Sequence, residues 1–142
     1  MQQLRCIPKR IGFAVIAVLI VVAGAHAGDI ALFDGKSVAA VVYEQTDGVP
    51  IAKAAALLAH DLTSLTGHKP LVASGMADIK GSAVVIGLAN SPAIAAILRA
   101  NKIDTTAIEG KWETYGRAVV PAPWDPNKKA LLIFGSDVRG TI

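Results

Sequence analysis

Histidines and carboxylates are the side chains that metal or acid–base chemistry would use first in this chain. His60 and His68 lie eight residues apart, and Asp61 points in a different direction around the helix that the local pattern predicts. A protein zinc site needs three or four converging ligands. The pattern therefore indicates two solvated histidines at a helix flank, and the sequence predicts no metal site.

Glu109 and Glu113 are four residues apart and form the acidic pair that glycosidase chemistry could use. A glycosidase holds its two carboxyl groups about 5–9.5 Å apart across the sugar, usually from different elements. Glu113 leads directly into a predicted strand, so helical spacing does not bring the two carboxylates together. We predict that both are exposed surface residues, and the sequence predicts no catalytic residue.

Three aromatic side chains, Trp112, Tyr115 and Trp124, could stack on sugar rings. They lie near the ends of predicted strands, where aromatic residues more often act as packing anchors. The sequence favours the packing role for all three.

Two glycine-containing turns follow predicted strands, at the position where phosphate-binding loops begin a helix. The first, at residues 87–92 (GLANSP), lacks both the G-x-G-x-x-G spacing and a Walker lysine. The second, Gly135-Ser136-Asp137, lacks the G-x-S-x-G pattern of a nucleophile elbow. We therefore interpret both turns as helix caps and predict no bound cofactor.

The first half of the chain predicts a buried strand at residues 38–43, followed by a long helix. Asp47 is available to cap this helix, Pro50 suits its first turn, and Gly67 suits its end. Apolar residues at three- and four-residue steps predict one buried stripe. The stripe consists of Ile51, Ala55, Leu58, Leu62 and Leu65.

The second half predicts four further strands, a second helix and the start of a third. The strands are expected at residues 69–73, 82–86, 114–120 and 130–134, with a polar, proline-rich linker at 121–129 between the last two. Ser91 and Pro92 predict the start of the second helix, which ends near Asn101 and buries Ile94, Ile97 and Leu98. Ser136 or Asp137 would cap the third helix.

The alternation of strands and helices predicts an α/β fold with a mixed β-sheet flanked by helices. The chain stops at Ile142, before the third helix has made two turns. We therefore expect the domain to be incomplete at its carboxyl terminus and to be the front part of a longer protein.

Residues 1–27 have the layout of a cleavable signal peptide. Three basic residues precede an uncharged apolar run at 11–22, and Ala25-His26-Ala27 supplies an A-x-A cleavage site. The run is shorter than the roughly 20 residues that a spanning helix needs, although an uncleaved anchor is the alternative. We expect cleavage before Gly28, export to the periplasm or the medium, and no membrane association afterwards.

The net charge of +3 belongs to the leader. Three of the 14 Lys and Arg residues lie there and none of the 11 acidic residues do, so residues 28–142 are formally neutral. No basic cluster interleaved with aromatic residues remains, which argues against nucleic-acid binding. The single cysteine, Cys6, also lies in the leader. Disulfides, thiolate metal sites and cysteine nucleophiles are therefore excluded from residues 28–142.

Four blocks in one order carry a resemblance to a known family. The blocks are residues 54–70 (with AAALLAHDL and LTGHKP), 84–87 (VVIG), 110–115 (GKWETY) and 130–142 (ALLIFGSDVRGTI). Together they resemble the amino-terminal domain of glycoside hydrolase family 115, the xylan α-1,2-glucuronidases. Val138 departs from the lysine that is usual in the last block.

The resemblance implies an exported enzyme that removes glucuronic acid or its 4-O-methyl ether from glucuronoxylan with inversion. Its catalytic groups would lie in a (β/α)8 barrel that follows this domain, so no catalytic residue is carried over. Residues 28–142 would be an accessory domain like the one that precedes the barrel in β-hexosaminidases, inactive by itself. The alternative is a free-standing secreted carbohydrate- or solute-binding module.

Overall fold

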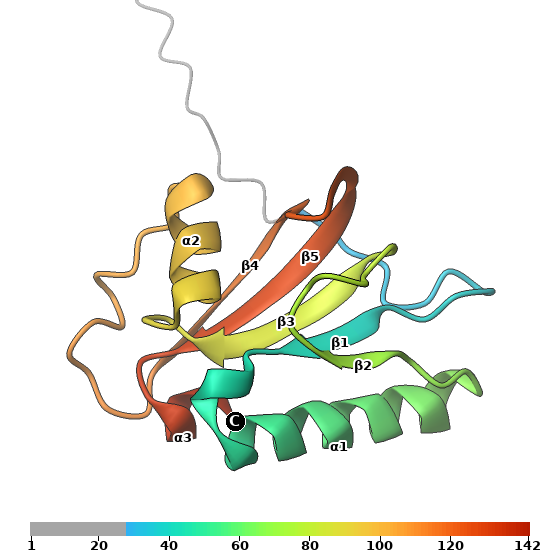
Figure 1. The fold of residues 1–142 in the computed structure, drawn as a ribbon, viewed down its shortest axis with the longest axis horizontal. Helices are drawn as coiled ribbons and strands as arrows, with labels where there is room; N and C mark the ends of the chain where they lie inside the picture. Colours follow the sequence, from blue (N-terminus) through green and yellow to red (C-terminus); the bar gives the residue numbers. More distant parts are fainter. Residues whose placement is uncertain (1–27) are drawn as a thin grey trace, which may run out of the picture.

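The computed structural model describes residues 28–142, and the predicted leader lies outside the described residues. They form a five-stranded sheet in the order β2-β1-β3-β5-β4, with helices packed on it (Figure 1). In chain order the elements are β1 (Ala40–Tyr43), the 3-10 helix η1 (Gln45–Asp47), α1 (Val49–Thr66), β2 (Val72–Ser74), β3 (Ala83–Leu88), α2 (Pro92–Ala100), β4 (Tyr115–Ala122), β5 (Asp125–Gly135) and α3 (Val138–Thr141).

The sheet is mixed, as predicted. β1, β2, β3 and β5 are parallel, and β4 pairs antiparallel with β5. β1 and β3 lie inside the sheet and are almost wholly buried, because they are uncharged runs of Ala, Val and Ile that both faces can cover. The structure confirms the α/β fold with helices flanking a mixed sheet.

Two apolar clusters lie on opposite faces of the sheet. On one face α2 packs over Val42 and Val85 with Ile94, Ile97 and Leu98, as predicted for this helix. On the other face α1 packs over Val41, Val84 and Ile86. Alternate residues of the same strands thus enter different clusters, because successive side chains on a strand point to opposite faces.

Helix α1 confirms most of its prediction but not the full stripe. Gly67 ends the helix in the left-handed conformation at φ 73°, and its N–H donates to the Thr63 carbonyl. Leu58 is partly buried, but Leu65 is 84% exposed, so its predicted burial was wrong. The 18-residue helix is about 27 Å long, whereas four-residue β1 spans only about 13 Å. In the turn that contains Leu65, Thr63 and Thr66 are partly buried, so Leu65 lies at the outer flank of the buried face.

The predicted linker at residues 121–129 is mostly strand. β4 and β5 form a hairpin in which Ala122 pairs with Asp125 across a two-residue turn. Pro121 is tolerated because β4 is an edge strand, where a missing N–H costs no ladder bond. The polar residues of this segment are exposed, which explains why their composition was mistaken for a loop.

The predicted strand at 69–73 is shifted and short. β2 contains only Val72–Ser74 and pairs with β1 alone. Pro70 precedes it and cannot donate a backbone hydrogen bond, so the ladder begins after it.

Candidate functional site

The junction between β1 and β3 is a topological switch point of the sheet. The helices that follow these neighbouring parallel strands, α1 and α2, pack on opposite faces. Open α/β sheets bind ligands in the crevice at such a point, outside the carboxyl ends of the strands. The carboxyl ends of β1 and β3 are therefore a candidate ligand site.

The carboxylate of Asp47 occupies this crevice. It accepts hydrogen bonds from the Leu88 N–H, at 2.6 Å, and from the Ser91 hydroxyl. Gly87 makes room for it, because a Cβ at that position would lie 2.8 Å from both Asp47 Oδ2 and Ile94 Cγ1. The protein thus places its own negative charge where a phosphate would be expected, which supports the prediction that residues 87–92 are not a phosphate loop.

This arrangement corrects two predicted capping roles. Asp47 does not cap α1, whose N-cap is Gly48 without a side-chain hydrogen bond. Ser91 is the N-cap of α2 by position, but its hydroxyl donates to Asp47 instead of capping the helix. Sequence reasoning missed the bridge because the two segments are more than 40 residues apart.

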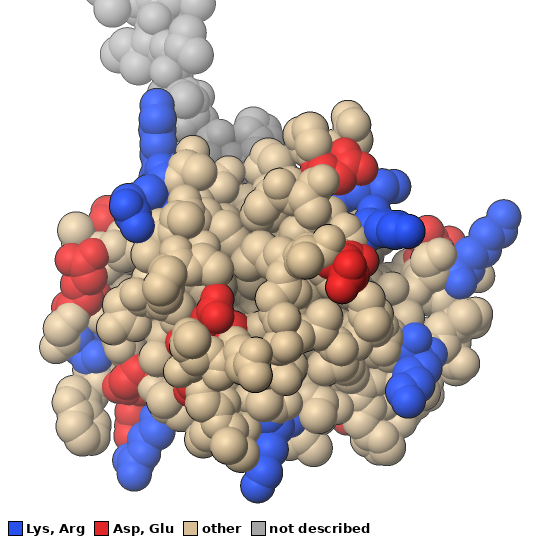
Figure 2. Space-filling model, in the orientation of Figure 1, with Lys and Arg blue, Asp and Glu red and all other residues tan. Residues whose placement is uncertain are grey.

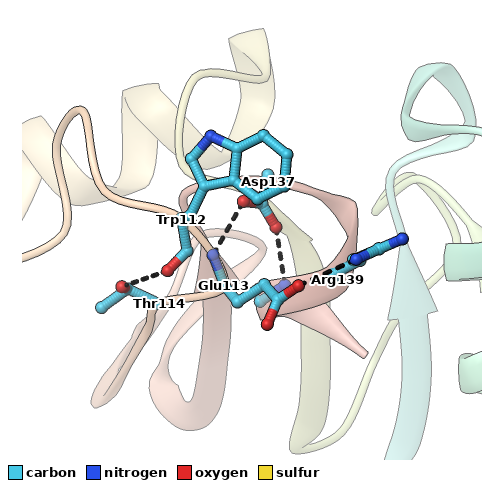
Figure 3. A network of polar contacts seen from close by, with 6 residues as sticks. Trp112, Glu113, Thr114, Asp137 and Arg139 are labelled. Carbon is cyan, nitrogen blue, oxygen red and sulfur yellow. Dashed lines mark hydrogen bonds and ion pairs between the residues drawn. The ribbon is translucent and has the colours of Figure 1, made fainter.

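A second polar network joins the start of β4 to α3 (Figure 3). We call it the β4–α3 corner, and it comprises residues 112–114 and 136–140. The Asp137 carboxylate accepts from the Glu113 N–H and from the Gly140 N–H, both at 2.8 Å. The Glu113 N–H, followed by that of Gly140, holds the pKa of Asp137 below its ordinary value. Asp137 therefore caps α3 as predicted and also connects it to β4.

Backbone contacts complete the corner. The Ser136 N–H donates to the Thr114 carbonyl at 2.8 Å, and the Thr114 N–H donates to the Ser136 hydroxyl at 3.2 Å. A Cβ on Gly140 would lie 2.5 Å from the Thr114 carbonyl oxygen, so only glycine allows this approach. The two segments of the corner lie within residues 110–115 and 130–142, two of the blocks that carry the resemblance, and are thus packed in direct contact.

The two glutamates of the candidate acidic pair bind different partners. Glu113 forms an ion pair with Arg139 at 3.0 Å, and Glu109 accepts a hydrogen bond from the Thr105 hydroxyl. Both are exposed, which confirms the predicted surface role. Glu113 also has a positive φ of 52°, a conformation that non-glycine residues rarely adopt.

Both histidines of the described residues are exposed, as predicted. His60 lies on the outer flank of α1. His68 lies 2.9 Å from the Thr66 carbonyl through Nδ1, and its ring is 5.0 Å from that of Phe33. No three His, Cys, Asp or Glu side chains among residues 28–142 gather closely enough to hold a metal ion.

The aromatic residues divide into one packed and two exposed side chains. Trp124 is partly buried and donates its indole N–H to the Gly81 carbonyl at 2.8 Å, which confirms its packing role. Trp112 is 82% exposed and Tyr115 is 61% exposed, so the packing role predicted for them was wrong. Tyr115 lies on the edge strand β4 and Trp112 lies in the loop before it, and both leave most of their surface open to solvent.

An apolar hollow of about 280 Å³ lies between α1, the sheet and α3, and we call it the α1–α3 trough. Its lining residues are Ala54, Leu58, Ile86, Tyr115, Ile133, Gly140, Thr141 and Ile142. α1 packs mainly on β1, β2 and β3. Leu131 and Ile133 on β5 are therefore only partly buried, and Arg117 opposite Ile133 is exposed.

The charged side chains of the described residues are dispersed. On the face that Figure 2 shows, Lys and Arg stand apart from one another around the rim instead of forming one patch. Within residues 28–142, neither α1 nor any other helix combines the length and hydropathy that crossing a bilayer requires.

No protein-family model matches the chain, and no curated protein matches it.

Proposed function

We propose that this chain is the amino-terminal, non-catalytic α/β domain of an exported glycoside hydrolase that removes (4-O-methyl)glucuronic acid from glucuronoxylan. The proposal starts from the four ordered blocks that resemble glycoside hydrolase family 115. Two of these blocks, residues 110–115 and 130–142, contain the two segments of the β4–α3 corner. Hydrogen bonds join the two blocks in this corner, which gives a structural reason for both to occur in one domain.

The observation that carries the proposal is the α1–α3 trough. It is an apolar hollow on the half of the sheet that α1 leaves open, and α3 enters it with a single turn. Ile133, in the lining of the trough, is only partly buried. An uncovered apolar face of this kind is typical of a domain that packs against further protein. In the proposed enzyme, the segment that follows α3 covers it.

The proposal assigns no catalysis to residues 28–142. Asp47 and Asp137 both use their carboxylates to bind backbone N–H groups, and Glu113 pairs with Arg139. The paired carboxylates of glycoside hydrolysis would therefore belong to a barrel elsewhere in the protein. The domain would pack on that barrel and shape the approach to it.

The test is to read the coding frame beyond the codon for Ile142 and to assay its complete product. A barrel-coding frame whose product releases glucuronic acid from glucuronoxylan is expected, whereas residues 28–142 alone should release none. A stop codon directly after Ile142, or turnover by residues 28–142 that depends on Glu113 or Asp137, would contradict the proposal.

A second measurement tests the role of the trough. Each 100 Å² of apolar surface that a cover removes from water contributes roughly 2.5 kcal/mol, which is appreciable beside the roughly 5–15 kcal/mol that is typical of a folded protein. Extending the chain by about a dozen residues of its own frame, the length of an average helix, should raise the unfolding temperature clearly. Equal, sharp transitions with and without the extension would show that the trough needs no cover.

The exposed Trp112 favours one alternative, a free-standing secreted carbohydrate-binding module. A stop codon after Ile142 together with binding of a polysaccharide by residues 28–142 would favour this alternative over the accessory domain.

A further inference from the structure

Trp112 is a large aromatic side chain held out into solvent by a fixed backbone. Its indole is 82% exposed. Its carbonyl accepts a hydrogen bond from the Thr114 hydroxyl at 3.0 Å, and the next N–H, that of Glu113, donates to Asp137. The flanking backbone is thus restrained on the side of β4. A ligand that covered this ring would gain hydrophobic stabilisation.

The surroundings of the ring are polar. Figure 3 draws Trp112 in the same corner as Glu113, Asp137 and Arg139. The Glu113 N–H binds Asp137, and the Glu113 carboxylate pairs with Arg139. Tryptophan and arginine are common in protein–protein interfaces, but Glu and Asp are depleted there. The two carboxylates of the corner, Glu113 and Asp137, therefore disfavour an apolar protein surface as the partner. A ligand with an apolar face and a hydrogen-bonding rim fits better.

The rim groups can both donate and accept hydrogen bonds. The ion pair between Arg139 Nη1 and Glu113 Oε1 uses one of the five guanidinium N–H donors and leaves the second carboxylate oxygen of Glu113 available. Both side chains remain accessible, at 73% and 54% exposure. Vicinal hydroxyl groups, which donate and accept at fixed spacing, match such a pair.

The balance of charge points to an uncharged ligand. Glu113 and Asp137 are acidic and Arg139 is basic, so the corner has no excess of positive charge that would attract an anion. We propose that the β4–α3 corner binds the main chain of a neutral polysaccharide, with one pyranose ring stacked on Trp112 and its hydroxyl groups bonded to Glu113 and Arg139. This site does not depend on the activity of any parent enzyme.

The two tryptophans allow a direct test by NMR. Purified protein is titrated with xylohexaose and, separately, with cellohexaose, and the indole N–H resonances are followed. The Trp112 resonance should shift and saturate with at least one sugar, whereas that of Trp124, which is bonded to Gly81, should not. Absence of a Trp112 shift with both sugars, or equal shifts of both tryptophans, would overturn the proposal.

Variants then separate stacking from hydrogen bonding. Trp112→Ala should weaken binding about tenfold or more, since a tenfold loss corresponds to about 1.4 kcal/mol. Leu65→Ala is the matched control, because Leu65 is equally exposed but lies in the last turn of α1, and it should bind like the natural protein. Arg139→Gln should weaken binding several-fold while the Trp112 resonance still shifts.

Two further outcomes would also contradict the proposal. Equal affinities of the Trp112→Ala and Leu65→Ala variants would remove the stacking role. Binding of polygalacturonate in preference to both neutral sugars would show that charge, and not the stacked ring, selects the ligand. The coding-frame test of the proposed function is unaffected by either result, so failure of the two proposals can be told apart.

Discussion

Asp47 and Asp137 each use a carboxylate to connect segments that are far apart in the chain. Asp47 bridges from η1 to the turn before α2, and Asp137 bridges from α3 to the start of β4. Hydrogen bonds from backbone N–H groups to a carboxylate are charge-assisted and stronger than neutral ones. Asp47 and Asp137, which follow the carboxyl ends of β1 and β5, therefore stabilise the fold.

The Asp47 bridge depends on Gly87, which gives a first prediction. In Gly87→Ala the new Cβ would meet Asp47 Oδ2 and Ile94 Cγ1 at 2.8 Å. Overpacking of this kind typically costs about 1–3 kcal/mol, and the free energy of unfolding in urea measures it. Gly81→Ala is the control, because a Cβ there meets nothing within 4 Å. Equal stability of the two variants would show that the crevice is looser than described.

The Asp137 bridge predicts a defined dependence on pH. Because the Glu113 and Gly140 N–H groups lower the pKa of Asp137 in the folded state, the carboxylate contributes stability above its ordinary pKa of 3.8. This contribution is lost as the pH falls through the lower folded value. Asp137→Asn should therefore unfold at a lower temperature at pH 7, and its difference from the natural protein should shrink in acid.

Asp104→Asn provides the comparison for this measurement. The pKa of Asp104 is also lowered, but by bonds to Thr106 within its own turn. Asp104→Asn should therefore lower the unfolding temperature at neutral pH less than Asp137→Asn does. A constant difference between Asp137→Asn and the natural protein at all pH values would contradict the assigned role.

At the scale of elements, α1 is longer than the strands that it covers. Its buried residues, Ile51, Ala55, Ala59 and Leu62, lie within the part that faces the sheet. Leu65 continues the apolar pattern but is exposed, whereas Thr63 and Thr66 beside it are partly buried. Periodicity locates the buried face of a helix, whereas the packing of the helix on the sheet decides which residues of that face are covered.

Two substitutions in α1 test this division. Ile51→Ala removes a fully buried side chain and should cost about 2–5 kcal/mol of unfolding free energy. Leu65→Ala removes an exposed one and should change stability by no more than about 0.5 kcal/mol. Comparable losses at the two positions, measured by chemical denaturation, would mean that the last turn of α1 packs against something in solution.

The hairpin of β4 and β5 shows how composition can mislead at this scale. Residues 121–129 contain several prolines and charges, which are typical of a loop. In the structure most of them belong to the paired strands β4 and β5, where Ala122 is buried and residues 126–129 are exposed. Their polarity reports exposure and not irregular backbone.

For the molecule as a whole, the expectation of export is independent of the described fold. The A-x-A site at residues 25–27 predicts cleavage before Gly28 in a secreting host. Amino-terminal sequencing of the exported product should therefore begin Gly28-Asp29-Ile30. A membrane-bound product that retains Met1 would favour an uncleaved anchor.

The sequence by itself determined the class of fold and the order of most elements. The alternation of buried strands with amphipathic helices, the end of α1 at Gly67 and the cap at Asp137 are local features. Local features depend on backbone conformation and side-chain periodicity over a few neighbouring residues. They can therefore be read without knowing where distant segments lie.

Only the tertiary structure decided which of these residues meet. Distant segments must approach each other to form the bridge from Asp47 to Ser91 and the contact of Glu113 with Asp137. Trp112 and Leu65 are exposed because no distant segment of the described residues covers them. A carboxylate after a strand looks the same in sequence whether it caps the next helix or a neighbouring one. The packing of whole elements decides between these outcomes, because it sets which N–H groups come within hydrogen-bonding distance.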